Sequence, residues 1–117
     1  MAHTLLIPLF RNEVAPRLDL AGEVLLVALD DAGNETSRST ILLKQPSAEE
    51  VCRIAQEERI LSVICNGVEE EFWQFLRWKR IDVIDGVMGT AEAAITRYRD
   101  GKLRSGDILF PTTGDQA

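Results

Sequence analysis

Apolar residues along the chain fall into short runs that are separated by polar turns. Runs of about four to eight apolar residues indicate strands, whereas apolar residues repeated every three or four positions indicate amphipathic helices. On this basis we expect strands at residues 5–10, 23–30, 36–44, 60–65 and 81–85, and helices at residues 48–58, 69–79 and 90–99. The chain should therefore begin with three strands and continue with alternating helices and strands.

Polar residues between the runs predict the connections. Residues 31–34, Asp-Ala-Gly-Asn, join two strand patterns and predict a β-hairpin. Ser47 and Glu50 have the spacing of a capping box, in which the serine hydroxyl accepts from the Glu50 amide and the Glu50 side chain reaches back. Thr90 is expected to cap the last helix, and Gly101 is expected to follow its end.

This order of elements predicts a mixed sheet between two layers of helices. Hairpins make the first three strands antiparallel neighbours, and a right-handed crossover places the fourth strand beside the first in parallel. The expected fold is a three-layer α/β/α arrangement of the ribonuclease H-like type, with a five-stranded mixed sheet of order 3-2-1-4-5 in which strand 2 is antiparallel. Pro8 cannot donate a hydrogen bond to a neighbouring strand, so we expect a bulge or an early end in the first strand.

The topology also predicts where a ligand would bind. Open α/β sheets bind ligands at the carboxyl ends of their strands, where the connections diverge. Here the segments 11–20, 65–69 and 85–90 should meet at one mouth, beside two helix N-termini that attract anions. The candidate binding residues combine cationic, amide and main-chain donors with one thiol: Arg11, Asn12, Arg17, Cys65, Asn66, Gly67, Gly89 and Thr90. The alternative is an ordinary strand-to-helix turn flanked by solvated loop residues.

Residues that commonly bind transition metals are few. Cys65 ends a strand beside a helix N-terminus, where a thiolate would be stabilised, so it is the candidate metal ligand; a structural cysteine is the alternative. Cys52 falls on the apolar face of a helix and should be a small core residue. His3 is the only histidine, and it should lie in a fraying terminus at the end of the sheet away from the mouth.

Two tryptophans flank the apolar stripe of the second predicted helix. Trp73 and Trp78 either cover an edge of the sheet or mark a surface for a partner protein.

Composition narrows the functions that are plausible. The net charge of −6 opposes binding to nucleic acid and docking to an anionic membrane. No cationic segment precedes the first apolar run, so we expect no signal peptide and a reducing, cytoplasmic location. We expect one domain over residues 1–110 and a frayed tail over residues 111–117, and a homo-oligomer stays open.

No catalytic constellation is recognisable in the sequence. A Ser-His-Asp set, a phosphate-binding loop and a dinucleotide fingerprint are all missing. A two-metal nuclease needs clustered carboxylates, whereas Asp19, Glu69 and Asp85 are scattered among loops. We therefore expect a protein that is not an enzyme, and a metal-dependent phosphoesterase is the least favoured function.

Four segments resemble a known family. Residues 7–19 are similar to an opening strand and loop that end in a Pro-Arg-Phe-Asp-like sequence, with Leu18 in place of the aromatic residue. Residues 64–71 resemble an apolar-Cys-Gly-Gly stretch with Asn66 in place of the first glycine, and residues 84–89 and 101–109 resemble the closing part. Together they resemble the dinitrogenase iron–molybdenum cofactor biosynthesis family, also called nitrogenase accessory factor-like.

This resemblance implies a ribonuclease H-like fold and, for some members, carriage of an iron–sulfur cofactor or its precursor. The expected function is a non-enzymatic binding or carrier protein for an iron–sulfur or iron–molybdenum cofactor or precursor, which is bound transiently and exchanged with cluster donor or acceptor proteins. Iron–sulfur clusters usually take several thiolates, so the lone Cys65 implies loose carriage by charge and hydrogen bonds, or a ligand shared by two subunits. The alternative is a cofactor-free protein-interaction or regulatory module.

Overall fold

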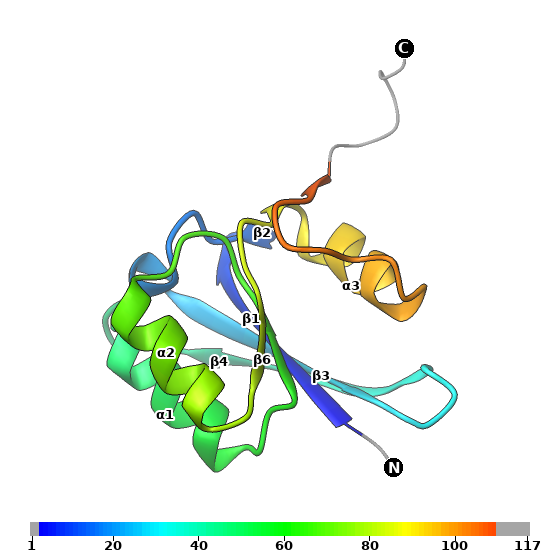
Figure 1. Ribbon diagram of the computed structural model, residues 1–117, viewed down its shortest axis with the longest axis horizontal. Helices are drawn as coiled ribbons and strands as arrows, with labels where there is room; N and C mark the ends of the chain where they lie inside the picture. Colours follow the sequence, from blue (N-terminus) through cyan, green and yellow to red (C-terminus); the bar gives the residue numbers. More distant parts are fainter. Residues whose placement is uncertain (1–2, 110–117) are drawn as a thin grey trace.

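The computed structural model, which describes residues 3–109, contains a mixed β-sheet with helices on both faces (Figure 1). The strands of this sheet are β1 His3–Phe10, β2 Glu13–Val14, β3 Glu23–Leu29, β4 Glu35–Leu42, β5 Ser62–Ile64 and β6 Asp82–Ile84. The helices are α1 Ala48–Glu57, α2 Glu70–Trp78 and α3 Ala91–Arg99, with a short 3₁₀ helix η1 at Leu18–Leu20. A separate pair is formed by β7 Met88–Gly89 and β8 Ile108–Leu109.

The main sheet runs in the order β4-β3-β1-β5-β6, and β2 pairs with β1. Strand β3 is antiparallel to both of its neighbours, whereas β5 is parallel to β1 and to β6. The predicted mixed α/β fold is therefore confirmed. The predicted count of five strands is wrong, because the sheet has six. The extra strand, β2, follows β1 in the chain and moves each later strand up by one number, so the path reads 4-3-1-5-6 where 3-2-1-4-5 was predicted.

Alternation along β1 gives the sheet a core on each face. Leu6 packs with α1 and α2, whereas Leu5 and Ile7 pack on the other face with α3. Figure 1 shows the same division, with α1 and α2 side by side and α3 across the sheet from them. A strand that is buried on both faces needs a nearly continuous apolar run, and the first strand has one.

Pro8 interrupts neither β1 nor its pairing. The register with β3 continues through Pro8, opposite Val24, to Leu9, so the expected bulge or early strand end is wrong. The Pro8 carbonyl accepts from the Ala15 amide (2.9 Å), which places its main-chain groups on the side away from β3. On that side β5 pairs only with Leu5 and Leu6. The nitrogen of Pro8 therefore lies beyond the end of β5, so β5 does not need a hydrogen bond from it.

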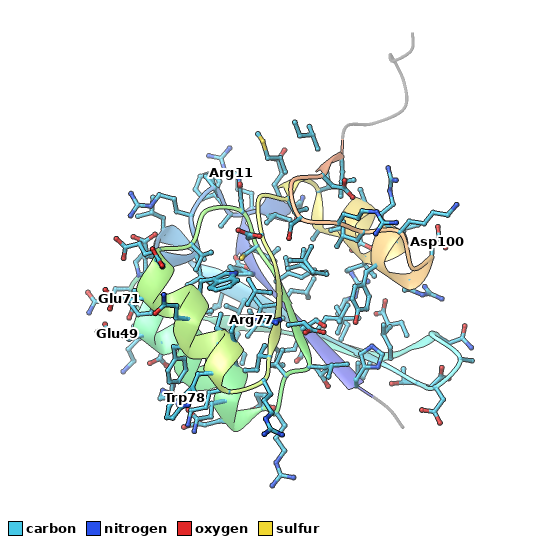
Figure 2. All side chains as sticks on the ribbon, viewed as in Figure 1. Arg11, Glu49, Glu71, Arg77, Trp78 and Asp100 are labelled. Atoms are coloured by element: carbon cyan, nitrogen blue, oxygen red, sulfur yellow. The ribbon has the colours of Figure 1, made fainter. Side chains whose placement is uncertain are left out.

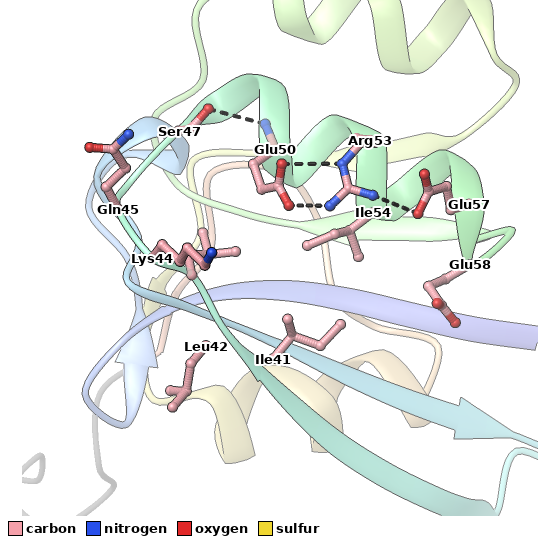
Figure 3. Close-up of a pocket in the computed structure, with 11 residues that line it drawn as sticks. Ile41, Leu42, Lys44, Gln45, Ser47, Glu50, Arg53, Ile54, Glu57 and Glu58 are labelled. Carbon is pink, nitrogen blue, oxygen red and sulfur yellow. Dashed lines mark hydrogen bonds and ion pairs between the residues drawn. The ribbon is translucent and has the colours of Figure 1, made fainter.

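The helix caps follow the sequence in part. The Ser47 hydroxyl accepts from the Glu50 amide (3.1 Å), and the Thr90 hydroxyl accepts from the Ala93 amide (3.1 Å), as expected. The Glu50 carboxylate does not complete the capping box; it pairs with Arg53, which also binds Glu57 (Figure 3). An arginine one turn away binds both oxygens of the carboxylate, whereas the Ser47 amide could offer it only one hydrogen bond.

The predicted turns are also present. Asp30 and Asn34 close the hairpin between β3 and β4 through a main-chain hydrogen bond of 2.9 Å, with Gly33 at φ 86°. Gly101 follows α3 with φ 73°. The predicted tail, residues 111–117, lies outside the described residues.

Candidate ligand-binding site

Three loops meet at the carboxyl ends of β1, β5 and β6, as the topology predicts. Main-chain hydrogen bonds join the segments 11–20 and 65–69 in both directions, from Leu18 to the Gly67 carbonyl (2.7 Å) and from Gly67 to the Pro16 carbonyl (2.9 Å). The Gly86 amide donates to the Asn66 carbonyl (3.0 Å), which adds the segment 85–90 to the same cluster. We call this cluster of segments 11–20, 65–69 and 85–90 the mouth.

The two glycines of the predicted site serve close packing of the chain. A Cβ atom on Gly67 would lie 2.9 Å from the Pro16 carbonyl oxygen, so the loops could not approach as they do with any other residue. A Cβ atom on Gly89, which has φ 129°, would lie only 2.2 Å from the Leu109 carbonyl oxygen. Both positions therefore require glycine for the fold, whether or not a ligand approaches them.

The cations of the mouth differ in their partners. Arg17 donates two hydrogen bonds to the Asp19 carboxylate, of 3.0 and 2.7 Å, so its charge is already paired. Arg11 is exposed at the mouth (Figure 2), and its guanidinium carbon lies 5.3 Å from the centre of the Phe10 ring. Among residues 3–109 no carboxylate pairs with Arg11. Arg11 is therefore the cation here that is best placed to meet an anion.

The helix N-termini at the mouth offer less than the sequence suggests. The Ala91 amide donates to the Asn12 carbonyl (3.0 Å) and the Ala93 amide to the Thr90 hydroxyl, so the first turn of α3 has two of its donors engaged. At α2 the exposed carboxylates of Glu69, Glu70 and Glu71 occupy the positive end of the helix and would repel an anion. Thr90 acts as the predicted helix cap, and its role in ligand binding stays a prediction.

The thiol of Cys65 is sealed inside the protein. Its side chain is 0% exposed, and burial, with smaller contributions from Asp85 and Cys52, raises the pKa of the thiol to about 12. The expected stabilisation of a thiolate is therefore wrong, since desolvation outweighs any effect of the nearby helix end. Metal binding by Cys65 stays a prediction, and it would require the loop 65–69 to open.

Cys52 behaves as predicted. It is buried on the inner face of α1, and desolvation raises the pKa of its thiol to about 11.

His3 belongs to β1 and does not fray. Its Nε2 atom lies 3.4 Å from the Tyr98 hydroxyl, and the two rings meet edge to face. The histidine pairs with Leu29 at the start of β1, which is the end of the sheet away from the mouth, as expected.

The two tryptophans are on the surface. Trp73 is 38% exposed and Trp78 is 75% exposed, so Trp78 in particular is available to a partner, and the partner-surface alternative stays a prediction. The sequence held a signal for Trp78, because it follows the fully buried Leu76 by two residues and is therefore turned about 200° around the helix.

Concave surfaces that the sequence did not predict lie outside the mouth. A groove of about 570 Å³ runs between the end of β4 and α1, with Ile41 and Ile54 among its apolar lining residues (Figure 3). A second groove of about 410 Å³ lies between α1 and α2 and is lined by Phe72 and Phe75. Within residues 3–109 no three histidine, cysteine or carboxylate side chains gather as a metal site. No helix in that range is long and apolar enough to cross a membrane.

Comparisons with known proteins identify the fold. No family model and no curated protein matches the sequence. Among solved structures, PH0822 superposes with a TM-score of 0.79 at 14% identity, over 87% of this chain and 93% of that one. MJ0327 from Methanocaldococcus jannaschii, named a "putative dinitrogenase", gives a TM-score of 0.72 at 18% identity, over 88% and 93% of the two chains.

A third similar structure is TM1290 from Thermotoga. It is named a "putative NifB protein" of the DUF35 family, and it gives a TM-score of 0.64 at 17% identity over 88% of this chain and 92% of that one. At these identities the similarity shows a shared fold.

Proposed function

We propose that this protein is a non-enzymatic binding or carrier protein, whose cargo is an anionic iron–sulfur or iron–molybdenum cofactor or a precursor of one. The observation that carries the proposal is the meeting of three loops at the mouth, where the exposed Arg11 has no carboxylate partner among the described residues. The ribonuclease H-like assignment is part of the proposal, and the strand path with helices on both faces supports it. Two structures with this fold carry nitrogenase-related names, which supports the class of cargo.

The donors at the mouth favour loose binding. Arg11 and Asn12 are exposed and can donate hydrogen bonds to sulfide or oxygen atoms of the cargo. Arg17 can join them by leaving Asp19, because an exposed ion pair of this kind is worth only about 0–1 kcal/mol. The buried Cys65 is not part of this first contact. Such a set of donors suits a carrier that must release its cargo to another protein.

Binding of tetrathiomolybdate, a small anionic molybdenum–sulfur complex, tests the proposal. Equilibrium dialysis with molybdenum analysis should show binding by the wild-type protein, and Arg11→Asn should weaken it about tenfold, the effect of losing one charge-assisted hydrogen bond. Arg80→Asn is the matched control, because Arg80 is also exposed and also has a positive φ (64°, against 60° for Arg11) but follows α2 at the other end of the sheet. Asparagine tolerates this backbone region, so both variants should fold.

The outcomes separate cleanly. A loss of binding in Arg11→Asn alone supports the mouth as the site. Equal losses in both variants would mean that binding depends on the net charge of the protein and not on the mouth. No binding by the wild-type protein would reject this cargo class.

The second candidate function is a cofactor-free protein-interaction module. The exposure of Trp73 and Trp78 favours it, since tryptophan is enriched in protein interfaces. Size-exclusion and pull-down measurements with Trp73→Ala and Trp78→Ala would test it, and unchanged association would dismiss these two residues.

A further inference from the structure

The outward face of α2 is unusual for a protein surface. Glu70, Gln74 and Arg77 form a ridge along the helix, and Trp73 and Trp78 lie on either side of it. Trp78 is 75% exposed, although a tryptophan has more apolar area to bury than any other side chain in this helix. Aromatic side chains and arginine are the residues that are enriched in interfaces, so this face has the composition of a contact surface.

Charge along α2 changes sign from one end to the other. Glu69, Glu70 and Glu71 lie at its start, whereas Arg77, Lys79 and Arg80 lie at its end. Two copies of such a helix attract each other when they run antiparallel and repel each other when they run parallel. A foreign helix of one charge sign would complement only half of the face, so this pattern favours a second copy of the same chain.

We propose that α2 forms the interface of a homodimer, in which the two α2 helices pack antiparallel about a two-fold axis. Glu70 and Arg77 are seven residues apart, so they share one side of the helix and are separated by about 10 Å along it. An axis that passes between residues 73 and 74 places Glu70 against the partner's Arg77, and Arg77 against the partner's Glu70. The tryptophans then enclose the partner's ridge and lose their contact with water.

The contacts that these residues make within one protomer are easily exchanged. Gln74 donates to the Glu70 carboxylate (2.9 Å), and Arg77 donates to Asp82 at the longer distance of 3.2 Å between exposed groups. The guanidinium of Arg77 lies 5.9 Å from the Trp73 ring, and the Lys79 ammonium lies 4.6 Å from the Trp78 ring. Both rings therefore already face cations of their own helix, and in the antiparallel arrangement Trp78 would lie beside the acidic start of the partner's α2.

Complementary charge reversals test the pairing directly. Each of the variants Glu70→Arg and Arg77→Glu brings like charges together at both symmetric contacts, so each should dimerise at least about a hundredfold more weakly than the wild-type protein. An equimolar mixture of the two variants restores both contacts and should form a heterodimer. Sedimentation velocity measures the association, and tryptophan emission follows it independently, because Trp73 and Trp78 are the only tryptophans of the chain.

Controls distinguish a lost interface from misfolding and from an effect of net charge. Far-UV circular dichroism checks that each variant is folded. Glu92→Arg makes the same charge change in the first turn of α3, on the opposite face of the sheet, and should leave dimerisation unchanged. A wild-type protein that stays monomeric at its highest soluble concentration would overturn the proposal. So would a mixture of the two variants that fails to associate. The proposal does not depend on the cargo, so a failure of tetrathiomolybdate binding leaves it standing.

Discussion

At the scale of single residues, the clearest electrostatic effect is on the two thiols. Cys52 and Cys65 belong to the same core, whose other buried members are aliphatic side chains, among them residues of β1, β3, β5, α1, α2 and η1. An ionised thiol would lose its hydration there, so the protonated form is favoured in both. The position of Cys65 beside a helix N-terminus could be predicted from the sequence, but its pKa could not, because the pKa depends on the burial of the sulfur atom.

Alkaline pH should therefore destabilise the protein through Cys65. The pKa of this thiol is raised from 9.0 to about 12 in the folded protein, so its contribution to stability is fully present below pH 9. That contribution is lost as the pH rises from 9.0 toward 12, by at most about 1.4 kcal/mol for each pKa unit. Urea unfolding across this range should show a shallower pH dependence in Cys65→Ala than in the wild-type protein. Parallel curves would contradict the buried, protonated thiol.

At the scale of elements, the predictions succeed where the local pattern is long. The three helices and the five longer strands are all found. Apolar patterns predict most of them, and Ser/Thr alternation that leads into Ile41 and Leu42 predicts β4. Strands β2, β7 and β8 have two residues each and therefore no period to detect. They exist because distant segments meet, as in the pairing of Met88 with Ile108 and the bridge between Glu13 and Thr90.

The start of α1 provides a test at this scale. Ser47→Ala removes the cap of the Glu50 amide and should lower the free energy of unfolding by about 1 kcal/mol. Glu50→Ala should cost less than Ser47→Ala, because Glu50 forms an exposed ion pair with Arg53 and does not return to Ser47. A double-mutant cycle measured by urea unfolding should give a coupling energy near zero. A coupling of about 1 kcal/mol would show that the reciprocal capping box forms after all.

At the scale of the whole molecule, topology explains why the mouth could be placed and its chemistry could not. The strand order alone brings the segments 11–20, 65–69 and 85–90 to one end of the sheet, and their hydrogen bonds confirm it. The state of each side chain depends on partners that no periodicity reveals. Arg17 is neutralised by Asp19, whereas Arg11 is not paired with any carboxylate of residues 3–109. The binding role of the predicted residues therefore stays a prediction.

Strand β1 also joins the two cores into one cooperative unit. Leu5 and Leu6 are both 0% exposed and point to opposite faces of the sheet, so neither core can open without releasing β1. Leu5→Ala and Leu6→Ala should each lower the free energy of unfolding by about 2–5 kcal/mol. Both tryptophans lie on α2, on the same face of the sheet as Leu6. If the two cores unfold together, their emission should still report the full effect of Leu5→Ala on the face that carries α3.

The measurement compares tryptophan emission with far-UV circular dichroism during urea unfolding. In both variants the two signals should give the same midpoint, as expected for a two-state transition. Leu42→Ala is the control, because Leu42 is 74% exposed and its removal should change stability by only about 0.5 kcal/mol. If Leu5→Ala shifted the circular dichroism midpoint and left the tryptophan midpoint in place, the layers would unfold separately. In that case β1 would not couple the face that carries α3 to the proposed dimer face of α2.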